Sequence, residues 1–200
     1  IAEEGLFKEF ADKGVATVNA HEVEASIPDL AALKNFTLDP SIGAVVVGFD
    51  RHLSYTKIAL AAMYINELDV PFIASNPDTT FIAPPARAMP EVAVTTSGIS
   101  AATGRDPVYV GKPNHFMMKD IARDHKLDLS RTLMIGDRLD TDVLFGNAAN
   151  VDTCLVFSGC TTMEVFLSKF NIPGVKPNKR HNIPHHHGHR PAAVRHQVAV

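Results

Sequence analysis

Two short segments of the sequence place chemically useful side chains where a predicted strand ends. Lys112 closes the apolar stretch 107–111, and a proline follows it at once. Asp137 comes just after the apolar stretch 132–135, and Asp142 lies five residues further along. In open parallel sheets, ligands bind at the carboxyl ends of the strands. We therefore expect Lys112 and Asp137 to lie near each other at one edge of a shared sheet.

The residue types at these two strand ends suit the handling of a phosphate group. A lysine neutralises phosphate charge, and an aspartate can hold Mg²⁺, which in proteins takes one or two carboxylates together with phosphate and water. We predict that Lys112 binds phosphate, that Asp137 is the metal ligand and that Asp142 supports the site by orienting ligand water. Metal and lysine together would offset the charge of a phosphoryl group during transfer. These three are the candidate catalytic residues.

Each motif taken alone also has an ordinary structural interpretation. A Gly-Lys-Pro sequence is a turn in most proteins, and Asp140 or Thr141 would serve as a simple helix N-cap. The functional interpretation rests on finding the two motifs together, 25 residues apart, each at the end of a predicted strand.

The elements around these motifs alternate between strand and helix, which predicts an α/β fold with a parallel sheet and right-handed crossovers. Continuous apolar runs are typical of strands buried on both faces, and periodic apolar stripes are typical of helices. The predicted strands are 15–18, 44–49, 70–75, 107–111, 132–135 and 152–157. The predicted helices are 4–13, 56–68, 114–126, 140–149 and one that opens with a capping box at Thr161.

Two segments interrupt this alternation. Residues 77–97 contain four prolines that break every periodic pattern, so we predict a long loop or linker there, with a domain boundary near residue 95. Residues 171–200 show no hydrophobic period and are rich in proline and histidine, which predicts a disordered tail. Clustered histidines at 185–189 invite a metal-binding interpretation, but the lack of a folded scaffold around them argues against an evolved metal site.

The composition and charge of the chain indicate which kinds of partner it does not bind. Hydrophobic residues make up 46% and charged residues 20% of the chain, as in ordinary globular proteins. No apolar run approaches the roughly 18 residues of a membrane helix, so we expect no membrane partner. The net charge is −3 and the basic residues gather after Glu164, which leaves an acidic body and argues against nucleic-acid binding. Two cysteines do not make a disulfide framework, which favours a cytoplasmic location.

The lysine and aspartate motifs resemble the third and fourth motifs of the haloacid dehalogenase (HAD) superfamily. Within it, the chain looks like the p-nitrophenyl phosphatase and phosphoglycolate phosphatase branch, whose cap domain resembles residues 47–57 and 73–78. The resemblance implies an incomplete Rossmann-like parallel-sheet core with an α/β cap domain. Residues 1–95 would then be the cap with its linker, residues 96–170 the C-terminal part of the core, and residues 171–200 the tail.

The resemblance also implies a mechanism. Members hydrolyse phosphate esters with Mg²⁺ through an aspartyl-phosphate, which is covalent catalysis by a carboxylate. By match with the family motifs, Lys112 binds the phosphate, Asp137 binds the magnesium ion and Asp142 is the supporting acid. Asn76 and Asp78 lie on a cap loop that helps to bind and choose the substrate.

The chain departs from the family pattern at three points. The first motif, two aspartates one residue apart after a buried strand, and the second motif normally precede the cap, yet cap-like sequence begins here almost at residue 1. Asp140 and Asp142 have the spacing of that pair but do not follow a buried strand. Residues 96–100 are short where the branch has a Gly-rich turn and a helix, and the tail replaces a final strand and helix. We therefore expect the isolated chain to have little or no activity.

Two functions are compatible with the sequence. The first is a Mg²⁺-dependent phosphatase of small phosphomonoesters such as phosphoglycolate, here a truncated copy. The second is a catalytically inactive relative that acts as an interaction protein or homodimer through its cap. A nucleotide-binding protein is disfavoured, because no Gly-rich phosphate loop follows any predicted strand.

Overall fold

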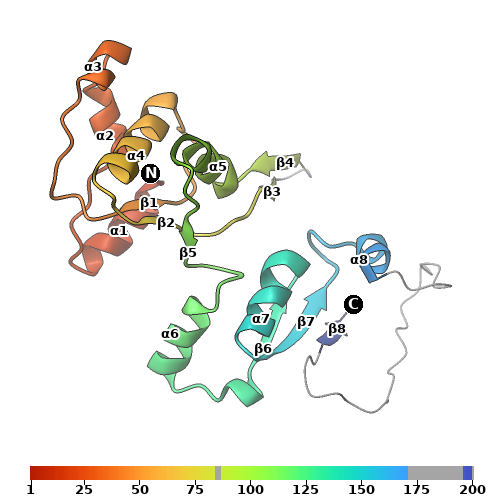
Figure 1. The fold of residues 1–200 in the computed structure, drawn as a ribbon. Helices are drawn as coiled ribbons and strands as arrows, with labels where there is room; N and C mark the ends of the chain where they lie inside the picture. Colours follow the sequence, from red (N-terminus) through yellow and green to blue (C-terminus); the bar gives the residue numbers. More distant parts are fainter. Residues whose placement is uncertain (84–86, 171–195, 200) are drawn as a thin grey trace. The chain divides into compact units, whose positions relative to one another are not determined.

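The computed structural model describes residues 1–83, 87–170 and 196–199. The chain divides into two compact units, Ile1–Gly111 and Lys112–Val200 (Figure 1). Both units combine helices with parallel strands, which confirms the predicted α/β class. No helix in the described ranges is long and apolar enough to cross a membrane.

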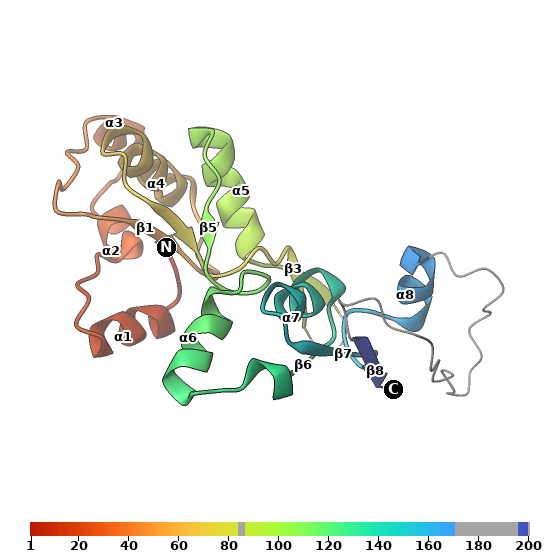
Figure 2. The same cartoon turned by 60° about the horizontal axis from the view of Figure 1, so that its bottom comes forward.

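The first unit is built on a three-stranded parallel sheet in the order β1-β2-β5. Two helices, α4 and α5, lie side by side against this sheet (Figures 1 and 2). Strand and helix residues such as Val47, Ala74, Ile65 and Ile99 are fully buried between them. The bounds are Val45–Val47 for β1, Phe72–Ala74 for β2, Val108–Tyr109 for β5, Tyr55–Glu67 for α4 and Val92–Thr103 for α5.

Three short helices precede this sheet. They are α1 (Glu4–Asp12), α2 (Ala20–Ala25) and α3 (Leu30–Lys34). The first confirms the predicted helix, but the predicted strand at 15–18 is wrong, because these residues form no strand and are exposed to solvent. Their β-branched side chains favour a strand only where a neighbouring strand supplies packing.

The predicted linker at 77–97 is also wrong. Strands β3 (Thr80–Ala83) and β4 (Arg87–Pro90) pair antiparallel there, and α5 follows. The prolines do not prevent this, because an isolated pair of strands has two edges and Pro90 ends its strand.

Helix α5 contains the segment that was predicted to be short. Residues 96–100 lie inside this 12-residue helix, which packs on α4 and β1, so the segment is not shortened. A Cβ at Gly98 would lie only 3.1 Å from Ile58 Cδ1, so the glycine lets the two helices approach closely. The first compact unit ends at Gly111, and the division into cap and core near residue 95 stays a prediction.

The second unit holds a separate parallel sheet in the order β6-β7-β8. Its first two strands match the predictions. The third lies in the predicted disordered tail, so that prediction is wrong for those four residues, and the rest of the tail lies outside the described residues. The bounds are Phe116–His125 for α6, Leu129–Arg131 for the 3₁₀ turn η1, Leu133–Gly136 for β6, Leu139–Val143 for the wide π-type turn η2, Leu144–Ala148 for α7, Asp152–Val156 for β7, Met163–Phe170 for α8 and His196–Ala199 for β8.

The strands that lead to Lys112 and Asp137 belong to different sheets, so the expectation of one shared sheet is wrong. Strand β5 pairs with β2, and the Gly111 N–H extends that pairing by donating to Ser75 O at 2.7 Å. Strand β6 pairs with β7. One helix start also differs from the prediction, because the hydroxyl that accepts from the first turn of α8 is that of Thr162 rather than Thr161.

Candidate functional site

Asp137 lies directly after β6 and is held by the loop that follows β7. The Cys160 N–H donates to Asp137 Oδ2 at 2.6 Å, and the Thr161 N–H donates to Asp137 O at 3.1 Å. A Cβ at Gly159 would overlap the Asp137 carboxylate, so this close approach requires glycine. Two neighbouring parallel strands therefore fix the position of one carboxylate.

The surroundings of Asp137 favour its ionised form. Burial by itself raises the pKa of this carboxyl, but the backbone N–H of Cys160, the Cys160 thiol and the Arg138 charge lower it, and the net pKa is below its ordinary value. Asp137 is therefore an anion at neutral pH, which is the form that binds a metal ion.

Asp142 connects the two predicted motifs. Its side chain is only 5% exposed, and its Oδ1 accepts from Lys112 Nζ at 2.7 Å. Its Oδ2 accepts from the backbone N–H groups of Asp137 and Arg138 at 3.0 and 3.1 Å. A Cβ at Gly136 would overlap the Asp142 carboxylate, so glycine is required at the end of β6 as well. Asp142 thus holds Lys112 and the loop of Asp137 and Arg138 together.

Lys112 is the open member of this group. Its side chain is 39% exposed while its ammonium is bound to Asp142. An ammonium has three donors, so the bond to Asp142 leaves capacity for an anion that approaches from solvent. Lys112, Asp137 and Asp142 therefore lie together as the sequence predicted, although the roles predicted for them are chemical and remain predictions.

Arg138 and the 158–160 loop were not among the predicted site residues. Arg138 forms a two-point ion pair with Asp140, with distances of 3.1 and 2.8 Å, and its Nη1 lies 3.9 Å from Cys160 Sγ. The Ser-Gly sequence directly after the apolar run 152–157 was a usable signal, because neighbouring parallel strands end at the same edge.

Asn76 and Asp78 belong to the first unit and form a turn of their own. Asn76 Oδ1 accepts from the Asp78 N–H at 3.1 Å, and Asp78 O accepts from the Ala93 N–H at the start of α5. Burial raises the pKa of nearby Glu91, and the Asp78 charge raises it further. The contribution of Asn76 and Asp78 to substrate binding remains a prediction.

The donor set around Asp137 fits Mg²⁺. Within the described ranges, no three or more His, Cys, Asp or Glu side chains lie together so that they could hold a metal ion by themselves. Magnesium typically needs only one or two protein carboxylates, with phosphate and water completing its octahedron. The ionised Asp137, seated against Gly159 where no side chain intrudes, offers one carboxylate of this kind, and its role as a magnesium ligand stays a prediction.

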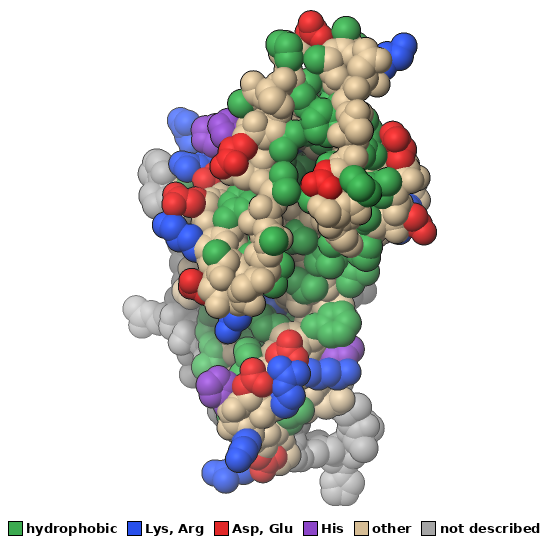
Figure 3. All heavy atoms as spheres, turned by 90° about the vertical axis from the view of Figure 1, so that its left-hand side faces the viewer, with side chains coloured by type: hydrophobic (Ala, Val, Ile, Leu, Met, Phe, Trp, Pro, Cys, Tyr) green, Lys and Arg blue, Asp and Glu red, His purple; other side chains and the backbone are tan. Residues whose placement is uncertain are grey.

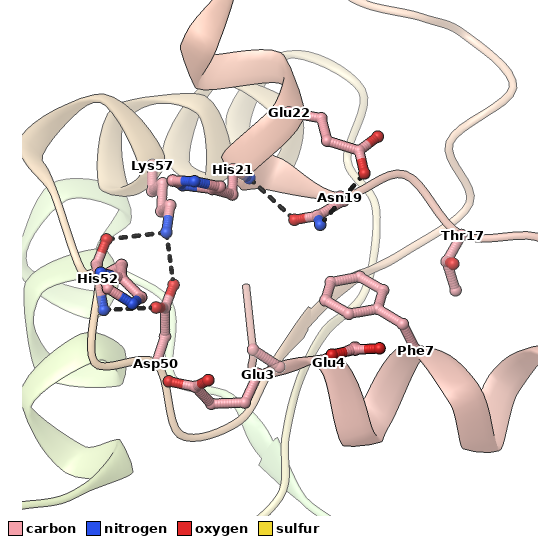
Figure 4. Close-up of a pocket in the computed structure, with 11 residues that line it drawn as sticks. Glu3, Glu4, Phe7, Thr17, Asn19, His21, Glu22, Asp50, His52 and Lys57 are labelled. Carbon is pink, nitrogen blue, oxygen red and sulfur yellow. Dashed lines mark hydrogen bonds and ion pairs between the residues drawn. The ribbon is translucent and has the colours of Figure 1, made fainter.

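A polar hollow of about 360 Å³ lies in the first unit, and none of the predicted site residues line it (Figure 4). Lys57 Nζ donates there to Asp50 Oδ2 and to His52 O, both at 2.8 Å. The side chains of Lys57 and Asp50 are only 2% and 4% exposed. The ion pair of this lysine is therefore closed to solvent, whereas the side chain of Lys112 is partly exposed.

Comparison with known proteins points to one family. The model of the HAD-hydrolase-like family matches residues 109–175, which include Lys112, Asp137 and Asp142. Phosphoglycolate phosphatase 2 of Arabidopsis thaliana is 33% identical over 86% of this chain and 57% of its own length.

The chain is also similar to solved structures of phosphatases. The p-nitrophenyl phosphatase from Archaeoglobus fulgidus has a TM-score of 0.67 and 28% identity, covering 88% of this chain and 60% of that one. A glycerol phosphate phosphatase from Mycobacterium tuberculosis, in complex with magnesium, has a TM-score of 0.55 and 29% identity, covering 60% and 36%. The chain spans about half the length of the curated relatives it matches.

Proposed function

The chain belongs to the haloacid dehalogenase superfamily, and we propose that it supplies the phosphate-binding lysine and the magnesium ligand of an enzyme that hydrolyses small phosphate monoesters. One observation carries the proposal: Asp142 bonds Lys112 with one oxygen and the Asp137 loop with the other. The names of the relatives point to phosphoglycolate and glycerol phosphate as the substrate class.

Each residue has a distinct task in this function. Lys112 pairs with phosphate oxygens and offsets their charge, while Asp142 accepts a hydrogen bond from the ammonium and holds it in position. Asp137 holds the magnesium ion through a carboxylate that stays ionised at neutral pH. The metal, when bound, supplies a Lewis acid that polarises the phosphoryl oxygens.

The nucleophile of the family reaction is not provided by Asp140 or Asp142. The carboxylate of Asp140 is engaged by Arg138, and both oxygens of the buried Asp142 accept hydrogen bonds. We therefore propose that the isolated chain binds Mg²⁺ and phosphate but turns over phosphate esters slowly or not at all.

Binding and turnover test these proposals separately. Titration of the chain with MgCl₂, followed by NMR of the Asp137 and Cys160 amides, is expected to show saturable shifts that Asp137→Asn removes and Asp140→Asn retains. Inorganic phosphate, added next, is expected to shift the NMR signal of the Lys112 ammonium group. Absence of both responses would contradict the function. Rapid Mg²⁺-dependent hydrolysis of p-nitrophenyl phosphate that Asp137→Asn abolishes would keep the function and refute the proposed inactivity.

A second function, association through the first unit, is favoured by one observation. The β3–β4 hairpin exposes the apolar side chains of Phe81, Ile82 and Met89. Sedimentation of the protein at several concentrations, with Ile82→Lys as the variant and Leu30→Lys, also exposed, as the control, tests it. A monomer at every concentration would exclude this function.

A further inference from the structure

The polar hollow of the first unit lies at the carboxyl end of β1 (Figure 4). Asp50, which lines it, follows that strand, Glu3 leads into α1, and Asn19 caps α2. In open α/β sheets, ligands bind outside the carboxyl ends of the strands. The volume of about 360 Å³ is also within the usual range of small-molecule sites. The polar hollow therefore has the position and the size of a ligand site.

Charged side chains are concentrated on this side of the first unit. Figure 3, which views the side of α1–α3, shows acidic, basic and histidine side chains close together along the left-hand edge of this face. Three of the four carboxylates that line the polar hollow already have a cation as partner. The pairs are Asp50 with Lys57 at 2.8 Å, Glu3 with Arg51 at 2.9 Å and Glu4 with Lys8 at 3.0 Å.

Glu22 is the fourth carboxylate of the lining, and its charge is not matched. Its carboxylate accepts a long hydrogen bond from Asn19 Nδ2 at 3.5 Å. The neighbouring His21 lies next to Glu24 instead, at 3.8 Å. Among the residues that the structure describes, no Lys, Arg or His forms an ion pair with Glu22. A ligand that completes the polar hollow should therefore carry a positive charge.

The walls of the polar hollow favour an organic cation over a metal ion. A metal ion held by one carboxylate needs phosphate or further protein ligands, and the described residues gather no three metal-binding side chains here. An organic ammonium ion instead gains from the face of an aromatic ring. Phe7 supplies such a ring, and Figure 4 shows it on the same side of the polar hollow as Asn19 and Glu22.

We propose that the polar hollow binds a small organic ammonium ion, with the charged nitrogen at Glu22 and its apolar substituents against the ring of Phe7. The carboxylate attracts the charge, and the ring attracts the same cationic group through its π face. The Lys57–Asp50 pair lies on the other side of the polar hollow and adds no net charge to it. All of these residues belong to the first unit, so the proposal does not depend on magnesium or phosphate binding.

Titration of the full chain with choline chloride, compared with the neutral isostere 3,3-dimethylbutan-1-ol, tests the proposal. At constant ionic strength, choline is expected to give saturable NMR shifts of the Glu22 backbone amide and the Asn19 side-chain amide. The neutral isostere is expected to bind about tenfold more weakly, since it loses both the ion pair and the cation–π contact. Equal affinities, or no saturable shift of these amides with choline, would overturn the proposal.

Two substitutions and a matched control assign the binding to this hollow. Glu22→Gln keeps the shape of the side chain and removes its charge, so choline should bind about threefold more weakly. Phe7→Leu stays apolar but loses the ring, and a loss of about threefold is expected there as well. Glu9→Gln removes an exposed carboxylate of α1 that does not line the polar hollow, so the affinity should be unchanged. Unaltered binding in Glu22→Gln, or an equal loss in Glu9→Gln, would overturn the proposal.

Discussion

Each compact unit of this protein pairs a lysine with an aspartate near a strand end, and the two pairs differ in exposure rather than in distance. Lys57 lies 2.8 Å from Asp50, and Lys112 lies 2.7 Å from Asp142. Lys57 is 2% exposed and also bonds a backbone carbonyl, whereas Lys112 is 39% exposed. The comparison shows that two ion pairs of nearly equal length can differ in whether solvent reaches the lysine. The one with an open side is the one that can meet a ligand.

The largest difference between the pairs is expected in stability. Lys57→Met removes the partner of a buried carboxylate, so we expect the free energy of unfolding of the first unit to fall by about 3–5 kcal/mol. Lys112→Met leaves Asp142 with two backbone donors, so a loss of only about 1–3 kcal/mol is expected in the second unit. Urea denaturation followed by circular dichroism measures both. Equal losses would break the comparison.

In the exposed pair, Asp142 is expected to contribute to the free energy of unfolding through all of its hydrogen bonds. Asp142→Asn replaces a charged acceptor of three hydrogen bonds. A loss of about 1.5–3 kcal/mol in the free energy of unfolding is expected, since that is the range for a charge-assisted bond. Asp140→Asn, at an exposed carboxylate, is the control and should stay within about 0.5 kcal/mol. A smaller loss for Asp142→Asn than for the control would contradict the role of Asp142 as the connecting residue.

The buried pair also depends on the turn that leads into α4. Ser54 accepts a hydrogen bond from the Lys57 N–H at 3.2 Å and caps this helix. Ser54→Ala is expected to lower the free energy of unfolding by about 1 kcal/mol. Ser54→Thr keeps the hydroxyl and should be close to neutral. Thermal melts of the two variants separate the cap from the general effect of substitution.

The smallest expected effect is a shift in titration at the open site. Burial raises the pKa of Asp137, and the Cys160 backbone and thiol lower it below its ordinary value of 3.8. Cys160→Ala removes only the thiol, so the pKa of Asp137 should rise towards 3.8, while Cys160→Ser keeps a donor and should hold it down. Carboxyl NMR titration measures the midpoint. A pKa that is unchanged in Cys160→Ala would show that the thiol has no part.

The same shift fixes the direction of the pH dependence. Because the folded pKa of Asp137 lies below the unfolded value, its contribution to stability is fully present above pH 3.8 and is lost as the pH falls through the lower folded pKa. Near neutral pH, this group is therefore expected to add no pH dependence to stability.

Sequence patterns predicted the strands and the longer helices because apolar runs and apolar periodicity are local properties. The run 44–49 became β1, and the stripe 56–68 became α4. The pairing of β3 with β4 was missed because Pro90 ends its strand instead of marking a linker. The strand predicted at 15–18 failed because a strand depends on a partner that local sequence does not specify.

The residues of the candidate site were predictable from the sequence, but the contacts that bring them together were not. Lys112, Asp137 and Asp142 were identified from residue type and position after apolar runs. The sequence did not reveal that their strands enter different sheets, or that Asp142 rather than a shared sheet edge brings them together. The contact of Cys160 with Asp137 spans 23 residues and depends on the pairing of β6 with β7.

The two glycines that lie against carboxylates constrain how this site can change over generations. A side chain at Gly136 would displace Asp142, and one at Gly159 would displace Asp137. A substitution of either glycine is therefore expected to displace the carboxylate that lies against it, with the same consequence as a substitution of that aspartate. Among homologous sequences we expect the two members of each pair to disappear together, so that a lineage in which Gly159 has drifted should have abandoned Asp137 as well.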